Sequence, residues 1–502
     1  LLPSYQNSYG QGNNLDYFEY KDGYGTTNAY STGLGGLDES WGPPLDVGLE
    51  FIQWNSFDGQ PKPWVSAPDG VRNFYNTGII TNNNVSLNGS SENASYRISL
   101  GKTDQTGVMH NTDYRKTNIG GNVKFKLSDK WDAGFSVNYI RTASDNLPNL
   151  GYDTTTNGTQ TAQLVWAARQ IDFDDLRDWR NLPLNTTGTN AGTPVNWNQA
   201  YNNNPFWALE TNTNTVAKDR IIGNVEVGYD FSDKLRLQLK TSIDYFTSLN
   251  TSRAAFGTAS NEFGFYKETG RTRYGINSEF LLSYNTPITE DLNFSLNFGG
   301  NSYVNNYHRN YMEAPQLQLP NVYNISNTRD GSSPVITHST SDQQINSLYG
   351  FGQFSFKDYL FLDFTGRNDW ASVLPLNNNS FFYPSVSMSA VVSDILKLDK
   401  SFVSFLKLRG GWANVGSAGP LSPYNIEPSY QFSTDPWGTT PIAFLPGTLW
   451  NPDIKNENTY EYEVGIDGRF FENRITVDFT YYDKKTEDVI LPVPKSAASG
   501  FT

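Results

Sequence analysis

Only three histidines occur in the chain, and they are the first residues to test for catalysis or metal binding. They are His110, His308 and His338, and none has a second histidine or a cysteine at ligand spacing. A zinc site needs such a cluster, so we expect no zinc and interpret the three as solvated residues. The sequence also lacks a Gly-x-Ser-x-Gly nucleophile motif and a phosphate-binding glycine loop. We therefore expect neither an enzyme nor a cofactor.

Carboxylates gather at two places where they could bind calcium. Asp172, Asp174 and Asp175 lie close together in one stretch, and Asp145 and Asp153 lie in another. Calcium takes oxygen ligands, but neither spacing matches a known calcium-binding loop. We expect a solvated acidic helix face for the first group, with calcium binding as the alternative, and we assign no metal ligand.

Tryptophans outside the regular parts of the sequence are the better candidates for ligand contacts. A flat indole ring stacks on sugar faces or peptide side chains, while Asn, Asp and Arg supply hydrogen bonds. The same rings could instead pack loops together. Because both alternatives stay open, the substrate-binding residues are left unassigned. The candidates are Trp41, Trp54, Trp64, Trp166, Trp179, Trp207 and Trp437.

Composition argues against several classes of protein. The 502 residues carry a formal net charge of −14 and contain no run of Lys or Arg, so we expect no nucleic-acid partner. No apolar stretch of about 18 residues is present, so we expect no transmembrane helix. The mean hydropathy of −0.54 looks soluble, but strands that alternate apolar and polar residues have a near-neutral mean. Aromatic residues reach 15%, and cysteine is absent.

A repeated hairpin pattern predicts the elements that position these residues. Two runs of alternating apolar and polar residues flank a very short polar turn, and the unit recurs along the chain. In one copy the turn is Ser128–Lys130, with apolar residues at Val123, Phe125, Leu127, Trp131, Ala133, Phe135, Val137 and Tyr139. Further turns are expected at Ser232–Lys234, Pro287–Asp291, Lys357–Asp358 and Phe471–Arg474.

Alternation with period two places the apolar side chains on one face of a sheet and the polar ones on the other. A closed barrel in lipid suits such strands, because its outside is apolar, its inside is wet and it has no free edge. Strands of roughly 10 to 15 residues suit a tilted membrane crossing. The sequence therefore predicts an all-β fold, a transmembrane antiparallel β-barrel, with about fourteen strands in this chain.

Long connections separate the hairpins. Residues 1–80, 143–215, 249–270, 300–342 and 414–457 lack sustained alternation. Short turns at one end and long loops at the other are typical of outer-membrane barrels, whose short turns are periplasmic and whose long loops are extracellular. Thr161–Arg180 has apolar residues at helical spacing, so we predict a short helix inside one of the loops.

Aromatic residues cluster where the predicted strands end. We interpret them as girdles at the membrane–water boundary, where an apolar ring with a polar tip is favoured, with ordinary sheet packing as the alternative. The clusters are Tyr139, Tyr245-Phe246, Phe381-Phe382-Tyr383 and Tyr481-Tyr482.

Short motifs then appear in a fixed order along nearly the whole chain. Leu2-Pro3 to Gln6-Asn7 opens the series, as a first barrel hairpin region. It continues with Tyr9-Gly10-Gln11-Gly12, Ser40-Trp41-Gly42-Pro43, Val71-Arg72-Asn73-Phe74, Asp104-Gln105-Thr106-Gly107, Asn203-Asn204-Pro205-Phe206-Trp207, Arg367-Asn368-Asp369-Trp370, Leu406-Lys407-Leu408-Arg409 and Tyr481-Tyr482-Asp483-Lys484. Together they resemble the SusC/RagA-like TonB-dependent transporters of Bacteroidetes. One departure is local: Trp370-Ala371-Ser372 stands where that family often has a Ser-Ser pair.

The resemblance implies a 22-stranded barrel in the outer membrane of a Gram-negative, Bacteroidetes-type cell. It implies a plug domain before Leu1, further strands after Thr502, and coupling through the plug to the TonB-ExbB-ExbD system. It also implies a SusD-like lipoprotein lid and active import of an oligosaccharide or a peptide. We expect residues 1–80 to hold a strand end and a long outer loop, 81–142 barrel hairpins, 143–215 a loop with a short helix, and 216–502 the remaining strands and loops.

Two other readings remain open. A passive porin or an adhesin barrel would have no plug and no lid partner. A soluble β-rich glycan-binding protein would need no membrane. The one-sided hairpins argue against the soluble protein, and the ordered motifs argue against the passive barrel.

Overall fold

A sheet of 14 antiparallel strands dominates the computed structural model, which describes residues 5–12, 39–147, 160–186, 188–198, 202–427, 429–433, 437–445 and 451–493. Each strand pairs with its neighbours along the chain, which confirms the predicted fold class and strand number. The strands are β3 (Ile79–Ser90), β4 (Ala94–Thr106), β5 (Asp113–Lys126), β6 (Trp131–Ser144), β7 (Asn214–Ser232), β8 (Leu235–Ala254), β9 (Phe265–Pro287), β10 (Leu292–Ala314), β11 (Val335–Phe356), β12 (Leu360–Ala371), β13 (Ser380–Val391), β14 (Val403–Ser417), β17 (Glu457–Phe470) and β18 (Ile475–Glu487).

Smaller elements lie in the connections. Two ribbons pair β1 (Glu50–Phe51) with β2 (Lys62–Pro63) and β15 (Gln431–Phe432) with β16 (Ala443–Phe444). The helices are α2 (Gln160–Val165), α3 (Pro205–Thr211) and α4 (Val392–Ile395), with 3-10 turns η2 (Arg72–Phe74), η3 (Phe173–Leu176), η4 (Trp179–Asn181) and η5 (Ile325–Asn327). Within the described ranges, none of these helices has the length and apolar character needed to cross a bilayer.

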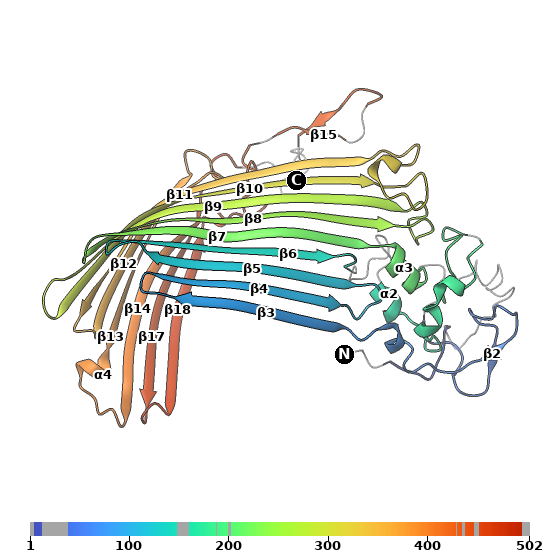
Figure 1. The fold of residues 1–502 in the computed structure, drawn as a ribbon, viewed down its shortest axis with the longest axis horizontal. Coiled ribbons are helices and arrows are strands. Elements are labelled where there is room, and N and C mark those ends of the chain that lie inside the picture. Colours follow the sequence, from blue (N-terminus) through green and yellow to red (C-terminus); the bar gives the residue numbers. More distant parts are fainter. Residues whose placement is uncertain are drawn as a thin grey trace.

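Short and long connections alternate along the sheet. The short-turn end carries 91–93, 127–130, 233–234, 288–291, 357–359, 392–402 and 471–474. The long-loop end carries 107–112, 145–213, 255–264, 315–334, 372–379 and 418–456, and α2, α3 and β2 gather there at the right of Figure 1. At the turn between β11 and β12, Lys357 and Asp358 both have positive φ, 52° and 53°, a conformation that follows the right-handed twist of the two strands.

Two of the predicted loops are largely strand. In place of a loop at 300–342, β10 continues to Ala314 and β11 starts at Val335. In place of a loop at 249–270, β8 continues to Ala254 and β9 starts at Phe265. Polar residues occupy both faces of these extensions, so hydropathy no longer alternates there although backbone pairing continues.

The early chain also differs from expectation. The opening motif was expected to be a barrel hairpin region, but residues 5–12 contain only isolated bridges, Tyr9 with Pro44 and Gly12 with Ser40. Leu2 and Pro3 lie outside the described residues. The segment is a loop partner of 39–45, because its hydrogen bonds go to that stretch.

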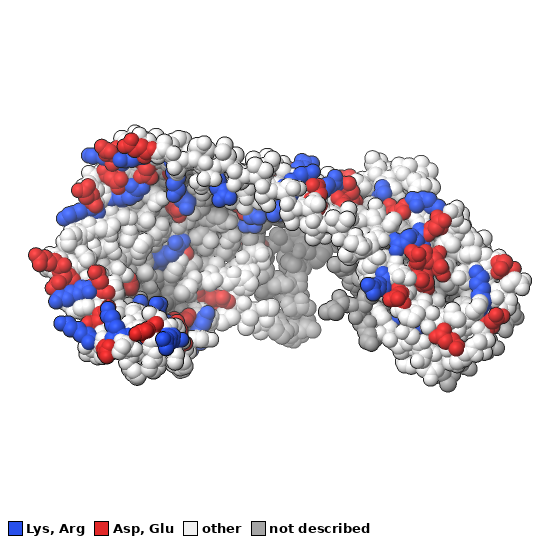
Figure 2. All heavy atoms as spheres, turned by 60° about the horizontal axis from the view of Figure 1, so that its bottom comes forward, with Lys and Arg blue, Asp and Glu red and all other residues white. Residues whose placement is uncertain are grey.

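The sheet curls into a trough with two different faces. Figure 1 shows β13, β14, β17 and β18 running across the direction of β3 to β8. Register places Phe125, Ala133, Val227, Leu239 and Phe280 side by side on one face, which we call the outer face. Polar residues occupy the other, inner face, and Figure 2 shows acidic and basic side chains interspersed around the hollow at its left. At the rims of the sheet lie β3 and β18.

Aromatic girdles form on the outer face, but only with part of the predicted residues. Tyr139 and Tyr245 share one cross-strand row with Ile221 and Tyr274. Near the short turns, the rings of Trp131 and Tyr229 lie 4.5 Å apart. Trp131 and Tyr139 are separated by about 26 Å of strand at roughly 3.3 Å per residue, comparable to an apolar band about 25 Å tall.

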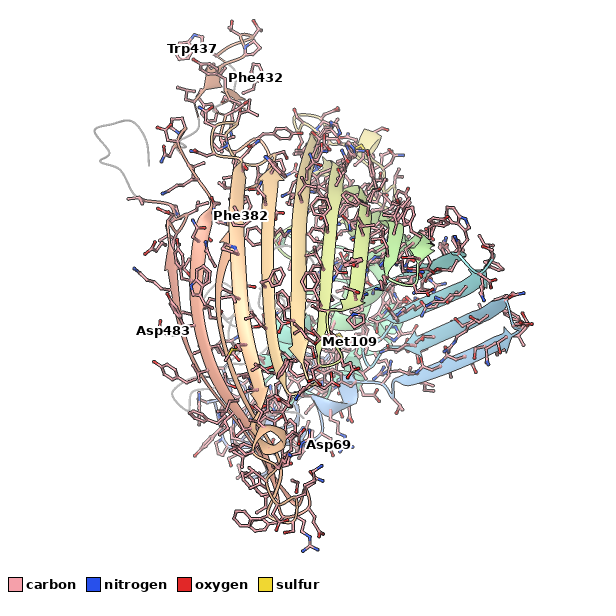
Figure 3. All side chains as sticks on the ribbon, turned by 90° about the vertical axis from the view of Figure 1, so that its left-hand side faces the viewer. Asp69, Met109, Phe382, Phe432, Trp437 and Asp483 are labelled. Atoms are coloured by element: carbon pink, nitrogen blue, oxygen red, sulfur yellow. The ribbon has the colours of Figure 1, made fainter. Side chains whose placement is uncertain are left out.

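Other residues of the predicted aromatic clusters point toward the inner face of the sheet. Of the Phe381–Tyr383 triplet, only Phe382 lies on the outer face, where it is 59% exposed and visible in Figure 3. Phe381 is buried and Tyr383 donates a hydrogen bond to Asp369. The girdle interpretation is therefore wrong for Phe381 and Tyr383. It is also wrong for Phe246 and Tyr482, because consecutive residues of a strand point to opposite faces.

A compact body, which we call the loop body, is formed by residues 39–78 together with 160–186, 188–198 and 202–213 of the connection between β6 and β7. Its core contains Phe74, Phe173, Trp197 and Phe206, all at most 1% exposed. The predicted helix Thr161–Arg180 is wrong beyond α2, since the chain breaks into the 3-10 turns η3 and η4. The apolar spacing there reflects burial of single residues in this core.

Helix α3 was not predicted, although its sequence begins with good start signals. Asn204 caps it by accepting hydrogen bonds from the Phe206 and Trp207 amides at 3.0 and 3.2 Å, and Pro205 occupies the first helical position. Asn203 ties the helix to the next long loop, donating to the Gly257 carbonyl at 2.8 Å.

Glu210 on α3 contacts two other segments, the turn η4 in the loop body and the 107–112 connection. Its carboxylate accepts hydrogen bonds from Arg180 and from the Trp179 indole at 3.3 Å, and His110 Nε2 lies 2.9 Å from its Oε1. Burial alone would raise the pKa of Glu210, but the hydrogen bonds from Arg180, His110 and Trp179 outweigh it and lower the pKa below its ordinary value of 4.5.

A charge on the outer face should destabilise the sheet far more than the same charge on the inner face. We expect Phe135→Arg to lower the free energy of unfolding by about 2–4 kcal/mol, the cost of a cation at mid-bilayer. The adjacent control, Ser136→Arg, points into the hollow and should cost less than 1 kcal/mol. Urea unfolding of the full-length protein in liposomes measures both. Equal losses would contradict the assignment of faces.

The Glu210 contacts should stabilise the loop body in a pH-dependent way. Because the folded-state pKa lies below 4.5, the stabilisation is present above pH 4.5 and is lost as pH falls through the folded-state value. Glu210→Gln should cost about 1–2 kcal/mol near neutral pH. Tryptophan fluorescence, followed from pH 6 to pH 3, should show an acid transition that this variant lacks. The exposed Glu50→Gln control should keep it; a transition unchanged in Glu210→Gln would refute the assignment.

Candidate functional site

The inner face of the sheet is lined with paired charges, and most of the pairs join different strands. Arg236 on β8 donates to Asp132 on β6 at 2.6 Å and to Asp230 on β7 at 3.0 Å. Arg220 on β7 makes a two-pronged contact with Asp244 on β8, at 2.8 and 2.7 Å. These positions face inward because the residues between them are the apolar members of the alternation.

A second group continues the pattern on β10, β11, β12 and β13. Arg367 donates to Asp369 at 2.8 Å, to the Ser347 hydroxyl at 2.7 Å and to the side-chain amide oxygen of Asn301 at 3.3 Å. Asp369 also accepts from the Tyr383 hydroxyl. The Arg367 guanidinium therefore fixes the positions of side chains from several strands on the inner face.

A third group lines a depression of about 490 Å³ on the inner face of β12 to β17. Arg409 on β14 lies 2.9 Å from Asp478 on β18 and 3.4 Å from Glu463 on β17. Lys407, Asp363 and Glu461 line the same depression. The Arg409 side chain is 31% exposed, so solutes in the hollow can reach it.

Such a wall can conduct polar molecules. Its charges are paired across strands, so the wall is hydrated without strongly favouring one sign of solute. Guanidinium and carboxylate groups offer hydrogen bonds to hydroxyl or amide groups that pass. The arrangement is that of a polar passage.

The predicted tryptophan candidates fall into two classes. Trp54, Trp64 and Trp207 are at most 7% exposed, and Trp179 packs beside the core while its indole donates to Glu210. These four hold the loop body together. Trp41, Trp166 and Trp437 are 57%, 40% and 81% exposed, so only these three of the seven present a ring to solvent.

The acidic candidates are engaged within the loop body. Asp172 caps η3 by accepting from the Asp174 amide at 3.0 Å and accepts from Asn73 at 3.0 and 3.1 Å. Asp174 pairs with Arg177 at 2.8 Å. Burial and the charges of Asp172 and Asp174 raise the pKa of Asp175. Asp174 and Asp175 are exposed, as expected, but they lie in the 3-10 turn η3 and not on the face of an α-helix.

The second acidic pair and the histidines lie apart from these contacts. Asp145 pairs with Arg115 at 2.6 Å, and Asp153 lies outside the described residues. His308 and His338 stand on the outer face near the long-loop end, beside Thr272 and Asn310 in the register. Across the described ranges, no three His, Asp or Glu side chains are placed to share a metal ion.

Sequence reasoning missed two kinds of functional residue. The paired charges of the inner face occupy the polar positions of each hairpin, so alternation could have identified them as inward residues but not their partners. The contacts of Arg169 and Glu39 in the loop body join segments far apart in the sequence, and no local signal marks them.

Comparison with known proteins agrees with this geometry. The family profile described as "TonB dependent receptor-like, beta-barrel" matches residues 167–502. The TonB-dependent receptor P26 of Formosa agariphila is 26% identical over 84% of this chain and 41% of its own length. The TonB-dependent receptor SusC of Bacteroides thetaiotaomicron is 24% identical over 92% of this chain and 45% of its own length.

A solved structure supports the fold. The RagAB peptide transporter superposes with a TM-score of 0.72 at 17% identity, over 86% of this chain and 47% of the matched chain. The chain spans less than half the length of the curated relatives named above. The predicted resemblance is thus confirmed: the chain belongs to the TonB-dependent receptors, as a SusC/RagA-like β-barrel of the Gram-negative outer membrane and not as an enzyme.

Proposed function

We propose that the protein carrying this chain imports a bulky nutrient, an oligosaccharide or a peptide, across the outer membrane. The observation that carries this proposal is the polar inner wall, on which Arg220, Arg236 and Arg409 each pair with a carboxylate on another strand. Beyond it stands a folded loop body large enough to receive a ligand. Energy would come from a TonB-ExbB-ExbD system acting on a plug domain.

A SusD-like lipoprotein is the proposed partner at the long-loop end. The ribbon β15–β16 projects beyond the strands and presents Phe432 and Trp437, as Figure 3 shows. These side chains are 77% and 81% exposed, and Tyr430 nearby is 70% exposed. Exposed aromatic residues grouped on a rigid ribbon are typical of interface anchors, and a lid over the loops would bury them.

The transport proposal is tested by uptake in the native cell. Growth on the nutrient, with import of a labelled form, should be lost when the gene is deleted and equally lost when TonB is absent. Active import needs that energy source, whereas a passive barrel does not. Import that continues without TonB would instead support the porin alternative.

The ribbon should hold the lid through its aromatic side chains. We expect Phe432→Ser combined with Trp437→Ser to lower the amount of lid that co-purifies with the barrel by about tenfold or more, since anchor residues contribute about 2 kcal/mol each. Ile288→Ser, an exposed apolar residue in a short turn at the opposite end, is the matched control. Undiminished lid recovery from the ribbon variant would exclude this docking surface.

A further inference from the structure

A small pocket opens in the loop body where three distant segments meet. Its volume is about 200 Å³, and its lining includes Tyr5, Glu39, Ser40, Trp41, Trp166 and Arg169. Two of the three exposed candidate tryptophans, Trp41 and Trp166, therefore share one pocket. The third, Trp437, stands on the ribbon and is not among its lining residues.

The backbone around the pocket is fixed before any ligand arrives. The Trp41 amide donates to the Gly12 carbonyl at 2.9 Å, and the Gly12 amide donates to the Glu39 carbonyl at 2.9 Å. Gln6 reaches the Ser40 carbonyl at 2.8 Å. The Ala67 amide donates to the Arg169 carbonyl at 2.8 Å. A preorganised site loses less entropy on binding.

Arg169 is a buried cation without an acidic partner. It is 4% exposed, its Nε donates to the Ala167 carbonyl at 3.1 Å, and its guanidinium carbon lies 4.2 Å from the centre of the Tyr5 ring. Among the described residues no carboxylate pairs with it, and burial lowers its pKa. A guanidinium has five N–H donors, so several remain for a ligand.

Glu39 supplies the complementary group. Its Oε2 is buried and has no hydrogen-bond partner in the described part of the chain. A buried carboxylate oxygen left without a donor is costly, so such an atom points to a missing donor. Glu39 and Arg169 do not form an ion pair with each other, which leaves an acceptor and a set of donors separately available in one pocket.

A neutral sugar ring fits this combination best. A hydroxyl group both donates and accepts, so one ring can donate to Glu39 and accept from Arg169. Its C–H face can lie on an indole. A charged peptide group is less suitable, because a carboxylate drawn to Arg169 meets Glu39 and an ammonium drawn to Glu39 meets Arg169. The small volume holds a single ring.

We propose that this pocket binds one neutral pyranose unit of a glycan, with Trp41 and Trp166 against the ring, Glu39 as hydrogen-bond acceptor and Arg169 as donor. The inference rests on the proposed import of a bulky nutrient and names the class of that nutrient. It assigns ligand contacts to the loop body in addition to the inner wall of the hollow.

The test measures binding to the full-length protein with its lid, in detergent, by isothermal titration calorimetry. The probes are maltohexaose, cellohexaose and xylohexaose, with a tryptic digest of casein as the peptide probe. We expect at least one sugar to bind, Glu39→Gln and Trp41→Ala each to weaken it about tenfold, and Trp41→Phe to restore most of the affinity. Ile288→Ser, which changes an exposed side chain in a short turn at the opposite end of the sheet, should leave sugar affinity unchanged.

Several outcomes would overturn the proposal. These are no binding by any of the three sugars, sugar binding that the Glu39 and Trp41 variants leave unchanged, or peptide binding that those variants weaken. TonB-dependent import that persists alongside such a result would show that the pocket inference alone has failed. Loss of TonB dependence in the uptake assay would instead remove the proposed transport function.

Discussion

In hydrocarbon, every backbone N–H and C=O group must find its partner within the protein, and this constraint shapes the whole molecule. Strands β4 to β17 of the large sheet meet it by pairing with a neighbour on each side, and β3 and β18 each pair with one neighbour. Once the backbone is paired in this way, each strand has one side toward lipid and one toward water. Period-two alternation, the aromatic rows at Tyr139 and Trp131 and the inner charges then follow from the same geometry.

The inner and outer faces of the sheet differ in how they accommodate charged side chains. On the outer face apolar residues such as Phe135 and Leu239 avoid the cost of desolvating charge in lipid. On the inner face Arg236 and Arg409 each contact two carboxylates on different strands. Pairing across strands keeps the wall polar and nearly neutral locally, although the chain as a whole carries a net charge of −14. Each of these two clusters has one guanidinium and two carboxylates, so each carries a formal charge of only −1.

The sequence predicted the strand segments whose outer face meets lipid. It did not predict the structure of the segments that meet water on both faces. Alternation around Ser128–Lys130 and Lys357–Asp358 located hairpins that the structure contains. It ended near residue 300 in β10, because Gly300 and Ser302 interrupt the outward apolar series there. Beyond Asn306, which lies in the aromatic row, both faces of the strand meet water and hydropathy carries no information about pairing.

The loop body shows the second limit of sequence reasoning. The helical spacing in Thr161–Arg180 came from residues buried in a shared core, not from one continuous helix. Glu210 and His110 are 100 positions apart, and Glu39 and Arg169 are 130 positions apart, so no local pattern could join them. Residue type alone placed Trp41 and Trp166 among seven candidates, but it could not separate them from Trp54, Trp64 and Trp207, which the fold buries.

The length of the central strands has a consequence for where the molecule meets its surroundings. On β9 the upper aromatic row lies at Tyr274, and the strand continues outward to Phe265. At roughly 3.3 Å per residue this is about 30 Å of strand, slightly more than the height of the apolar band itself. The long strands thus extend the sheet beyond the apolar band, so that its long-loop end lies well outside the bilayer. A large molecule can then reach the long-loop end in open solution. At that distance from the membrane, crowding by the membrane surface no longer limits its approach.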